Sequence, residues 1–149
     1  MSNPNALREF KEGLDLLRNH CPGEALVRFR RAADLDTTNP FYLSYLGLAL
    51  ARTRGKILDA EKLCRDAVRR QCNKAELYLN LAEVYGRSGQ REDAIETLLA
   101  GLRFTRQDAR LAEALNKLGR RRPPVVFFLN RENFINVGLG KIRHHLTQR

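Results

Sequence analysis

The chain has 149 residues, 43% of them hydrophobic and 30% charged, a composition that can bury a core and excludes a disordered chain. Lys and Arg number 27 against 17 Asp and Glu, for a formal net charge of +10, so acidic partners such as nucleic acid, acidic peptides or anionic lipid are compatible with it. No apolar run approaches the roughly 18 residues of a transmembrane segment. The three cysteines include no C-x-x-C pair, which predicts no disulfide framework and no metal site and indicates a reducing, cytoplasmic location.

Capping residues and turns predict where the helices begin and end. Asn3-Pro4 and Asn39-Pro40 each place a capping Asn before a Pro at the first helical position. Asn73 and Glu76 have the spacing of a capping box. The turns within three successive helix pairs read RNHCPGEA, RTRGKILDA and RSGQREDA, and each contains a Gly suited to the left-handed residue after a helix end.

Small residues recur at steps of 34 and 35 positions, which indicates an internal repeat. The three columns that keep this step are Gly13, Gly47 and Ala82; Ala25, Ala60 and Ala94; and Ala32, Ala67 and Gly101. We interpret them as sites where two antiparallel helices approach closely, with large apolar residues filling the space beside them. Cys64 and Cys72 are expected to fill such interfaces as small apolar groups. Because one helix pair cannot bury its own apolar face, stacked pairs forming a solenoid are predicted.

A seventh helix and a different C-terminal segment follow the repeats. In ARLAEALNKLGRR, residues 109–119 are predicted as a closing helix with one apolar face. Pro123-Pro124 must end the helical pattern, so residues 1–122 are expected to form the repeat domain and residues 123–149 a basic, partly apolar tail. From Lys117 onward the chain carries 8 basic residues and 1 acidic residue. The apolar run VVFFL is expected to be covered, either by the chain's own last helices or by a second copy.

The repeat pattern resembles the tetratricopeptide repeat family. The segments YLSYLGLAL and YLNLAEVY match the first helix of its motif, and EALVRFRRAADLD, DAEKLCRDAV and DAIETLLAGL match the second helix. The resemblance implies an all-α, right-handed α-solenoid of antiparallel helix pairs with a C-terminal extension. Its repeats would span about residues 6–39, 40–74 and 75–108.

In this family the first helices of the pairs line a concave groove that takes peptides or partner helices, which implies a protein partner. Carried over to this sequence, the groove residues would be Phe10, Leu14, Leu17, Phe41, Tyr45, Leu48, Arg52, Asn80, Glu83 and Arg87. The N-terminal half of that set is apolar and aromatic, which favours an apolar or helical ligand. Plain packing remains the alternative interpretation for some of these residues.

One subtype of the family holds the acidic C-terminal peptides of heat-shock chaperones with a clamp of Lys and Asn on the first helices. The equivalent positions here hold Phe10, Leu14, Tyr45, Glu76 and Asn80. Only Asn80 fits the clamp, and Glu76 would repel a carboxylate. The resemblance therefore disfavours binding of a chaperone tail.

Neither catalysis nor a cofactor is predicted. His20 beside Cys21 lacks an orienting acid, and His144-His145 lacks further metal ligands. We therefore expect a non-enzymatic scaffold or adaptor. The alternatives are nucleic-acid or anionic-surface binding through the basic C-terminal region, and a self-assembling subunit that forms a homo-oligomer through the tail. The tail residues expected to make contacts are Arg120, Arg121, Arg122, Phe127 and Phe128.

Overall fold

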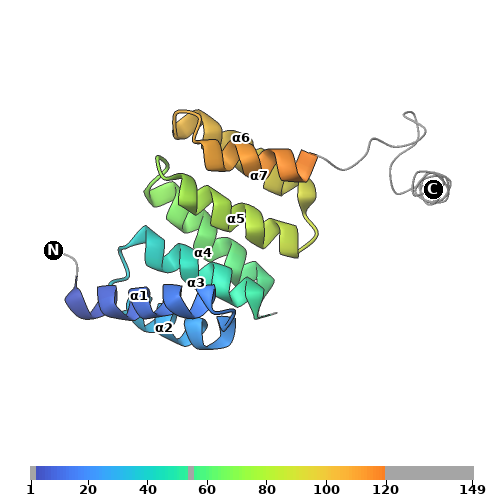
Figure 1. Cartoon of the computed structure of the whole chain (residues 1–149). Helices are drawn as coiled ribbons and strands as arrows, with labels where there is room; N and C mark the ends of the chain where they lie inside the picture. Colours follow the sequence, from blue (N-terminus) through green and yellow to red (C-terminus); the bar gives the residue numbers. More distant parts are fainter. Residues whose placement is uncertain (1–2, 54–55, 120–149) are drawn as a thin grey trace, which may run out of the picture. The chain divides into compact units, whose positions relative to one another are not determined.

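The structure, a computed structural model, describes residues 3–53 and 56–119, and these residues form seven α-helices and no strand. The helices are α1 Pro4–Arg18, α2 Pro22–Leu35, α3 Pro40–Arg52, α4 Ile57–Arg70, α5 Ala75–Arg87, α6 Arg91–Phe104 and α7 Ala109–Gly119. Helices α1 and α2, α3 and α4, and α5 and α6 contact one another as pairs, while α3 also contacts α2 and α5. Figure 1 shows the pairs stacked one on another, from α1–α2 at one end to α7 at the other. The predicted all-α solenoid is confirmed.

Two of the predicted helix starts are confirmed and one is wrong. The side chains of Asn3 and Asn39 accept hydrogen bonds from backbone N–H groups two residues on, each at 3.0 Å, which satisfies donors left free at a helix N-terminus. Asn73 does not cap α5. The chain still turns at this residue, so the N-cap is the extended Lys74, which makes no capping side-chain hydrogen bond.

Of the predicted turn glycines, Gly89 takes the left-handed conformation with φ 79°, as expected. In the first turn the prediction is wrong, because Gly23 lies inside α2 and His20 holds the positive φ of 59°. Gly55 of the second turn lies outside the described residues. The α6–α7 turn contains two further residues with positive φ, Arg106 and Gln107.

The small-residue columns mark close helix contacts, as predicted, and all nine residues are buried. A Cβ atom added to Gly47 would lie 2.7 Å from the carbonyl oxygen of Ala60 and 2.7 Å from Sγ of Cys64. One added to Gly13 would lie 2.6 Å from the ring of Phe29. These distances are shorter than van der Waals contact, so the helices can approach only because the positions lack a side chain.

The buried side chains form two clusters, one in the first half of the helical stack and one in the second. Leu111 of α7 is fully buried in the second cluster, and Leu115 and Leu118 pack against it while half-buried, as the closing-helix prediction requires. Cys64 is buried, but the prediction for Cys72 is wrong: it is exposed in the α4–α5 turn.

Candidate functional site

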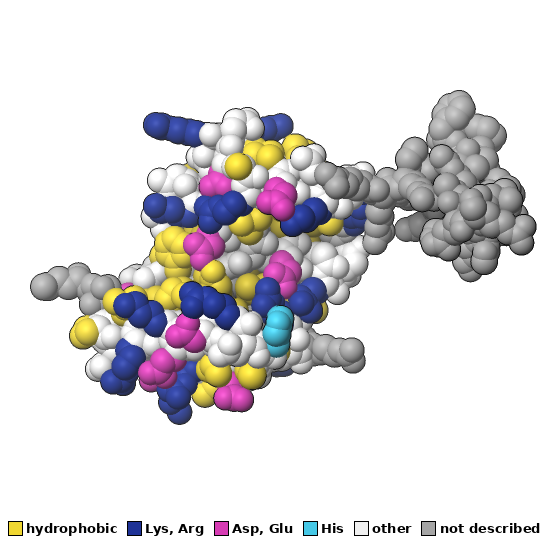
Figure 2. Space-filling view, in the orientation of Figure 1, with side chains coloured by type: hydrophobic (Ala, Val, Ile, Leu, Met, Phe, Trp, Pro, Cys, Tyr) yellow, Lys and Arg dark blue, Asp and Glu magenta, His cyan; other side chains and the backbone are white. Residues whose placement is uncertain are grey.

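The first helices of the three pairs, α1, α3 and α5, and the closing helix α7 form a surface that we call the groove face. Figures 1 and 2 view the domain from the side on which α1, α5 and α7 lie. In Figure 2, two rows of Lys and Arg side chains flank an area where apolar side chains are exposed. The groove face in Figure 2 therefore combines apolar surface with charged side chains of both signs.

The N-terminal part of the groove face rests on an aromatic cluster. The ring of Phe10 lies 4.9 Å from that of Tyr42 and 5.2 Å from that of Tyr45, centroid to centroid. Phe29, fully buried beneath them, lies 5.4 Å from Tyr45. Offset and edge-on pairs of this kind each contribute about 0.5–1.5 kcal/mol beyond the area they bury. Phe10 and Tyr45 remain half-buried, so they are packed and still available for contact.

Leu14 and Phe41 lie in the same apolar region. Both are half-buried and pack against the first core cluster. Their partial exposure leaves accessible apolar surface on α1 and α3. Together with Phe10 and Tyr45, they form the apolar section of the groove face.

Tyr45 links the apolar section to α5, because its hydroxyl donates a hydrogen bond to the carboxylate of Glu76. Burial, together with this carboxylate acceptor, raises the pKa of Tyr45. The phenol therefore stays neutral and remains a donor at physiological pH. Glu76 thus places its carboxylate at this point of the groove face.

A charged section lies next to it on α3 and α5. The guanidinium of Arg52 donates to both carboxylate oxygens of Glu83, each at 2.8 Å, and Arg87 donates to the same carboxylate at 3.0 Å. Although burial alone would raise it, the hydrogen bonds and charges of the two arginines hold the pKa of Glu83 below its ordinary value. Two cations share one anion, so this section carries a net positive charge.

Three of the predicted groove residues are buried instead. Leu17 is 9% exposed, Leu48 is 3% exposed and Asn80 is 7% exposed. The amide of Asn80 donates to the hydroxyl of Ser44 at 3.0 Å inside the α3–α5 interface, where a buried amide needs such a partner. These three side chains have packing roles in the structure, because helices cover them, and we leave them out of the contact set.

A depression that the sequence analysis missed lies between α5 and α7. This α5–α7 hollow has a volume of about 440 Å³. It is lined by Leu79, Ala82, Glu83, Gly86, Arg87, Leu98, Ala114, Lys117 and Leu118. Most of its lining is apolar, with charged side chains at Glu83, Arg87 and Lys117, and its volume is within the range of small-molecule sites.

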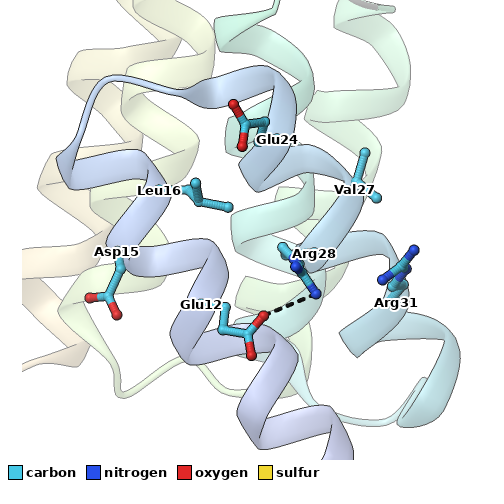
Figure 3. A pocket seen from close by; sticks show the side chains of 7 residues that line it. All are labelled: Glu12, Asp15, Leu16, Glu24, Val27, Arg28 and Arg31. Atoms are coloured by element: carbon cyan, nitrogen blue, oxygen red, sulfur yellow. Dashed lines mark ion pairs between the residues drawn. The ribbon is translucent and has the colours of Figure 1, made fainter.

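A second depression, of about 480 Å³, lies between α1 and α2 and is mostly charged. Figure 3 shows Glu12 of α1 and Arg28 of α2 facing each other across it, 2.9 Å apart. Arg28 also bonds the largely buried carboxylate of Glu9 at 3.1 Å. The cation at its centre is therefore already satisfied by two carboxylates, which favours a structural role.

The predicted tail contacts lie outside the described residues. They are Arg120, Arg121, Arg122, Phe127 and Phe128. Within residues 3–53 and 56–119, no group of three or more His, Cys, Asp or Glu side chains is placed to hold a metal ion. None of the seven described helices is both long and apolar enough to cross a membrane.

Sequence comparison identifies the same repeat. Residues 51–118 match the model of a tetratricopeptide repeat family. The chain is also 37% identical over 84 residues to the TPR repeat-containing thioredoxin TTL4 of Arabidopsis thaliana. That match covers 56% of this chain and 12% of the relative, so the chain spans about an eighth of the relative's length.

Solved structures share the fold at lower identity. The first TPR of Spaghetti (RPAP3), bound to the HSP90 peptide SRMEEVD, superposes with a TM-score of 0.67 at 19% identity, covering 80% of this chain and 97% of that one. The Sgt2 TPR domain from Aspergillus fumigatus superposes with a TM-score of 0.69 at 16% identity, covering 80% of each chain. The repeat columns, the seven helices and these matches agree. Residues 51–118 thus match the tetratricopeptide repeat family, and the described helices adopt the all-α solenoid fold of tetratricopeptide repeat domains.

Proposed function

We propose that the protein is a non-enzymatic adaptor whose groove face binds a segment of a partner protein. The observation that carries the proposal is the half-exposed apolar section formed by Phe10, Leu14, Phe41 and Tyr45. Partly exposed aromatic and apolar side chains gathered on one face are typical of protein-binding surfaces. The structural likeness to a tetratricopeptide repeat domain bound to an HSP90 peptide supports the same class of function.

The chemistry of the groove face disfavours a partner segment that ends in an acidic C-terminus. Glu76 carries a negative charge in the groove and is held there by Tyr45, so it would repel a terminal carboxylate. Asn80, whose position fits a carboxylate clamp, is buried and bonded to Ser44. The partner segment proposed here is amphipathic, with apolar residues on the α1–α3 section and polar residues beside Arg52 and Glu83.

The cysteines bear on the cellular location of the protein. The described cysteines, Cys21, Cys64 and Cys72, are all free. Free thiols are compatible with a reducing compartment, and a cytoplasmic adaptor is part of the proposal.

A pair of photo-crosslinking positions tests the groove. Benzoylphenylalanine in place of Leu14 samples the apolar section, and the same residue in place of Val27, which is 52% exposed on α2, is the matched control away from it. We expect crosslinks to a defined partner segment from position 14 only. A synthetic peptide of that segment should then lose affinity at least about tenfold to the Leu14→Ala variant, as a central contact does.

Two results would overturn the proposal. Crosslinks from position 27 but not from position 14 would move the interface to the other side of the domain. A peptide whose affinity is unchanged by Leu14→Ala, with the variant folded by circular dichroism, would mean that the apolar section only packs.

A further inference from the structure

Three equivalent helix interfaces follow one another along the groove face. They lie between α1 and α3, between α3 and α5, and between α5 and α7. The residue columns fix the correspondence, with steps of 34 or 35 positions. Leu77 and Leu111 correspond in this register, and both are fully buried, so α7 follows α5 in the same register as its predecessors. The three equivalent interfaces can therefore be compared residue by residue.

The first two interfaces are filled. Between α1 and α3, the rings of Phe10, Phe29 and Tyr45 occupy the position. Between α3 and α5, the hydrogen-bonded side chains of Ser44 and Asn80 occupy it. In both cases side chains that contact one another fill the space between the two helices.

The second interface is also closed by charge. Arg52 of α3 and Glu83 of α5 join across it through two hydrogen bonds of 2.8 Å. A bidentate pair of this kind is the strong form of an ion pair. It ties the two helices together over the filled position.

The third interface, between α5 and α7, differs at each of these points. Ala114 stands where the second interface has Asn80, which removes the side chain that would fill the space. Lys117 stands where the second interface has Glu83, opposite Arg87 in the position of Arg52. Two cations cannot pair, so the ion pair that joins α3 and α5 has no counterpart here, and the α5–α7 hollow of about 440 Å³ stays open.

The two cations beside the hollow, Arg87 and Lys117, each form an ion pair with a glutamate of their own helix. Arg87 contacts Glu83, and Lys117 contacts Glu113 on its own helix at 2.7 Å. The side chains of Arg87, Lys117 and Glu113 are 44%, 72% and 66% exposed. The Lys117–Glu113 pair is exposed on both sides and contributes little. Arg87 shares the carboxylate of Glu83 with Arg52, so both cations can take an incoming carboxylate.

We propose that the α5–α7 hollow binds a large apolar side chain of the partner segment with a carboxylate beside it, the carboxylate bridging Arg87 and Lys117. The apolar group fills the space over Leu79, Leu98 and Leu118 that Asn80 fills one repeat earlier. The carboxylate takes the place that Glu83 holds in the preceding ion pair. This inference rests on the proposed function, since the ligand belongs to the same partner.

Small-molecule probes test it on the full chain. The probe is 4-phenylbutyrate, an apolar ring with one carboxylate, and the matched control is 4-phenylbutylamine, which reverses the charge. Amide NMR shifts are followed to about 10 mM, because a ligand of roughly 12 heavy atoms is expected to bind in the millimolar range. We expect shifts at Leu79, Gly86 and Leu118, and at least about threefold weaker binding of the amine.

Two variants separate filling from charge. Ala114→Leu fills the hollow and should weaken 4-phenylbutyrate binding at least about tenfold, whereas Ala109→Leu, exposed on the same helix, should leave it unchanged. Lys117→Glu restores an Arg–Glu pair with Arg87 and should remove the preference for the carboxylate. Amide spectra of each variant establish that the fold is kept.

The proposal is overturned if the probe shifts no amide around the hollow, including the case in which another part of the chain occupies it. Equal affinity for the two probes, or no effect of Ala114→Leu in a folded variant, overturns it as well. Crosslinking from position 14 with no probe binding would remove this inference and leave the proposed function standing. Probe binding without partner crosslinks would show that the hollow takes this ligand chemistry, while the proposed function would fail.

Discussion

Replacing Gly47 with Ala tests the close helix approach on which the solenoid depends. The added methyl would lie 2.7 Å from both the carbonyl oxygen of Ala60 and Sγ of Cys64. The first of these is backbone, so α3 and α4 must move apart to relieve the clash, which costs about 1–3 kcal/mol. The better helix propensity of Ala returns about 1 kcal/mol. We expect a net loss of up to about 2 kcal/mol in the free energy of unfolding.

Gly86→Ala is the matched control, because a Cβ at this helical position meets nothing within 4 Å. Only the propensity gain applies there, so this variant should be about 0.5–1 kcal/mol more stable than the parent. Urea unfolding followed by circular dichroism measures both variants. Should Gly47→Ala prove as stable as Gly86→Ala, the close contact between α3 and α4 would not exist as described.

Three further outcomes are expected. Arg91 donates to the last turn of α7, so Arg91→Gln should speed hydrogen exchange in α7 roughly tenfold, as loss of about 1.5 kcal/mol would; unchanged exchange would contradict the contact. Because the pKa of Glu83 is lowered from 4.5, its contribution to stability is present above that value and lost as pH falls through the folded pKa, so Glu83→Gln should flatten the acid side of the stability curve. Cys64 is fully buried and its pKa is raised to about 12 by desolvation, so a thiol reagent at pH 8 should titrate Cys21 and Cys72 in the native protein and the third thiol only in denaturant.

Periodic features of the fold could be predicted from the sequence because close packing leaves a strong signal. Helices can approach at Gly13 and Gly47 only without a side chain, so small residues must recur at the repeat length. Features set by a single turn were less predictable. His20 adopts a left-handed conformation that Gly usually supplies. Asn73 has capping spacing but lies one residue before the N-cap, Lys74.

The candidate site was only partly predictable for a related reason. Assigning residues to the groove face by position treats each helix alone, and burial depends on the neighbouring helix. Asn80 lies on the predicted face, yet the hydroxyl of Ser44 on α3 draws it into the interface. The α5–α7 hollow is visible only when Ala114 and Lys117 are compared with Asn80 and Glu83 in the preceding repeat, a comparison across two helices.

Mapping the bound partner segment on the domain tests the central claim most directly. The segment identified by crosslinking is synthesised and titrated into the isotope-labelled full chain, and amide shifts are measured by NMR. The account predicts shifts concentrated on α1, α3, α5 and α7, including residues around Leu14 and Tyr45. Shifts concentrated on α2, α4 and α6, with the groove face unaffected, would contradict it.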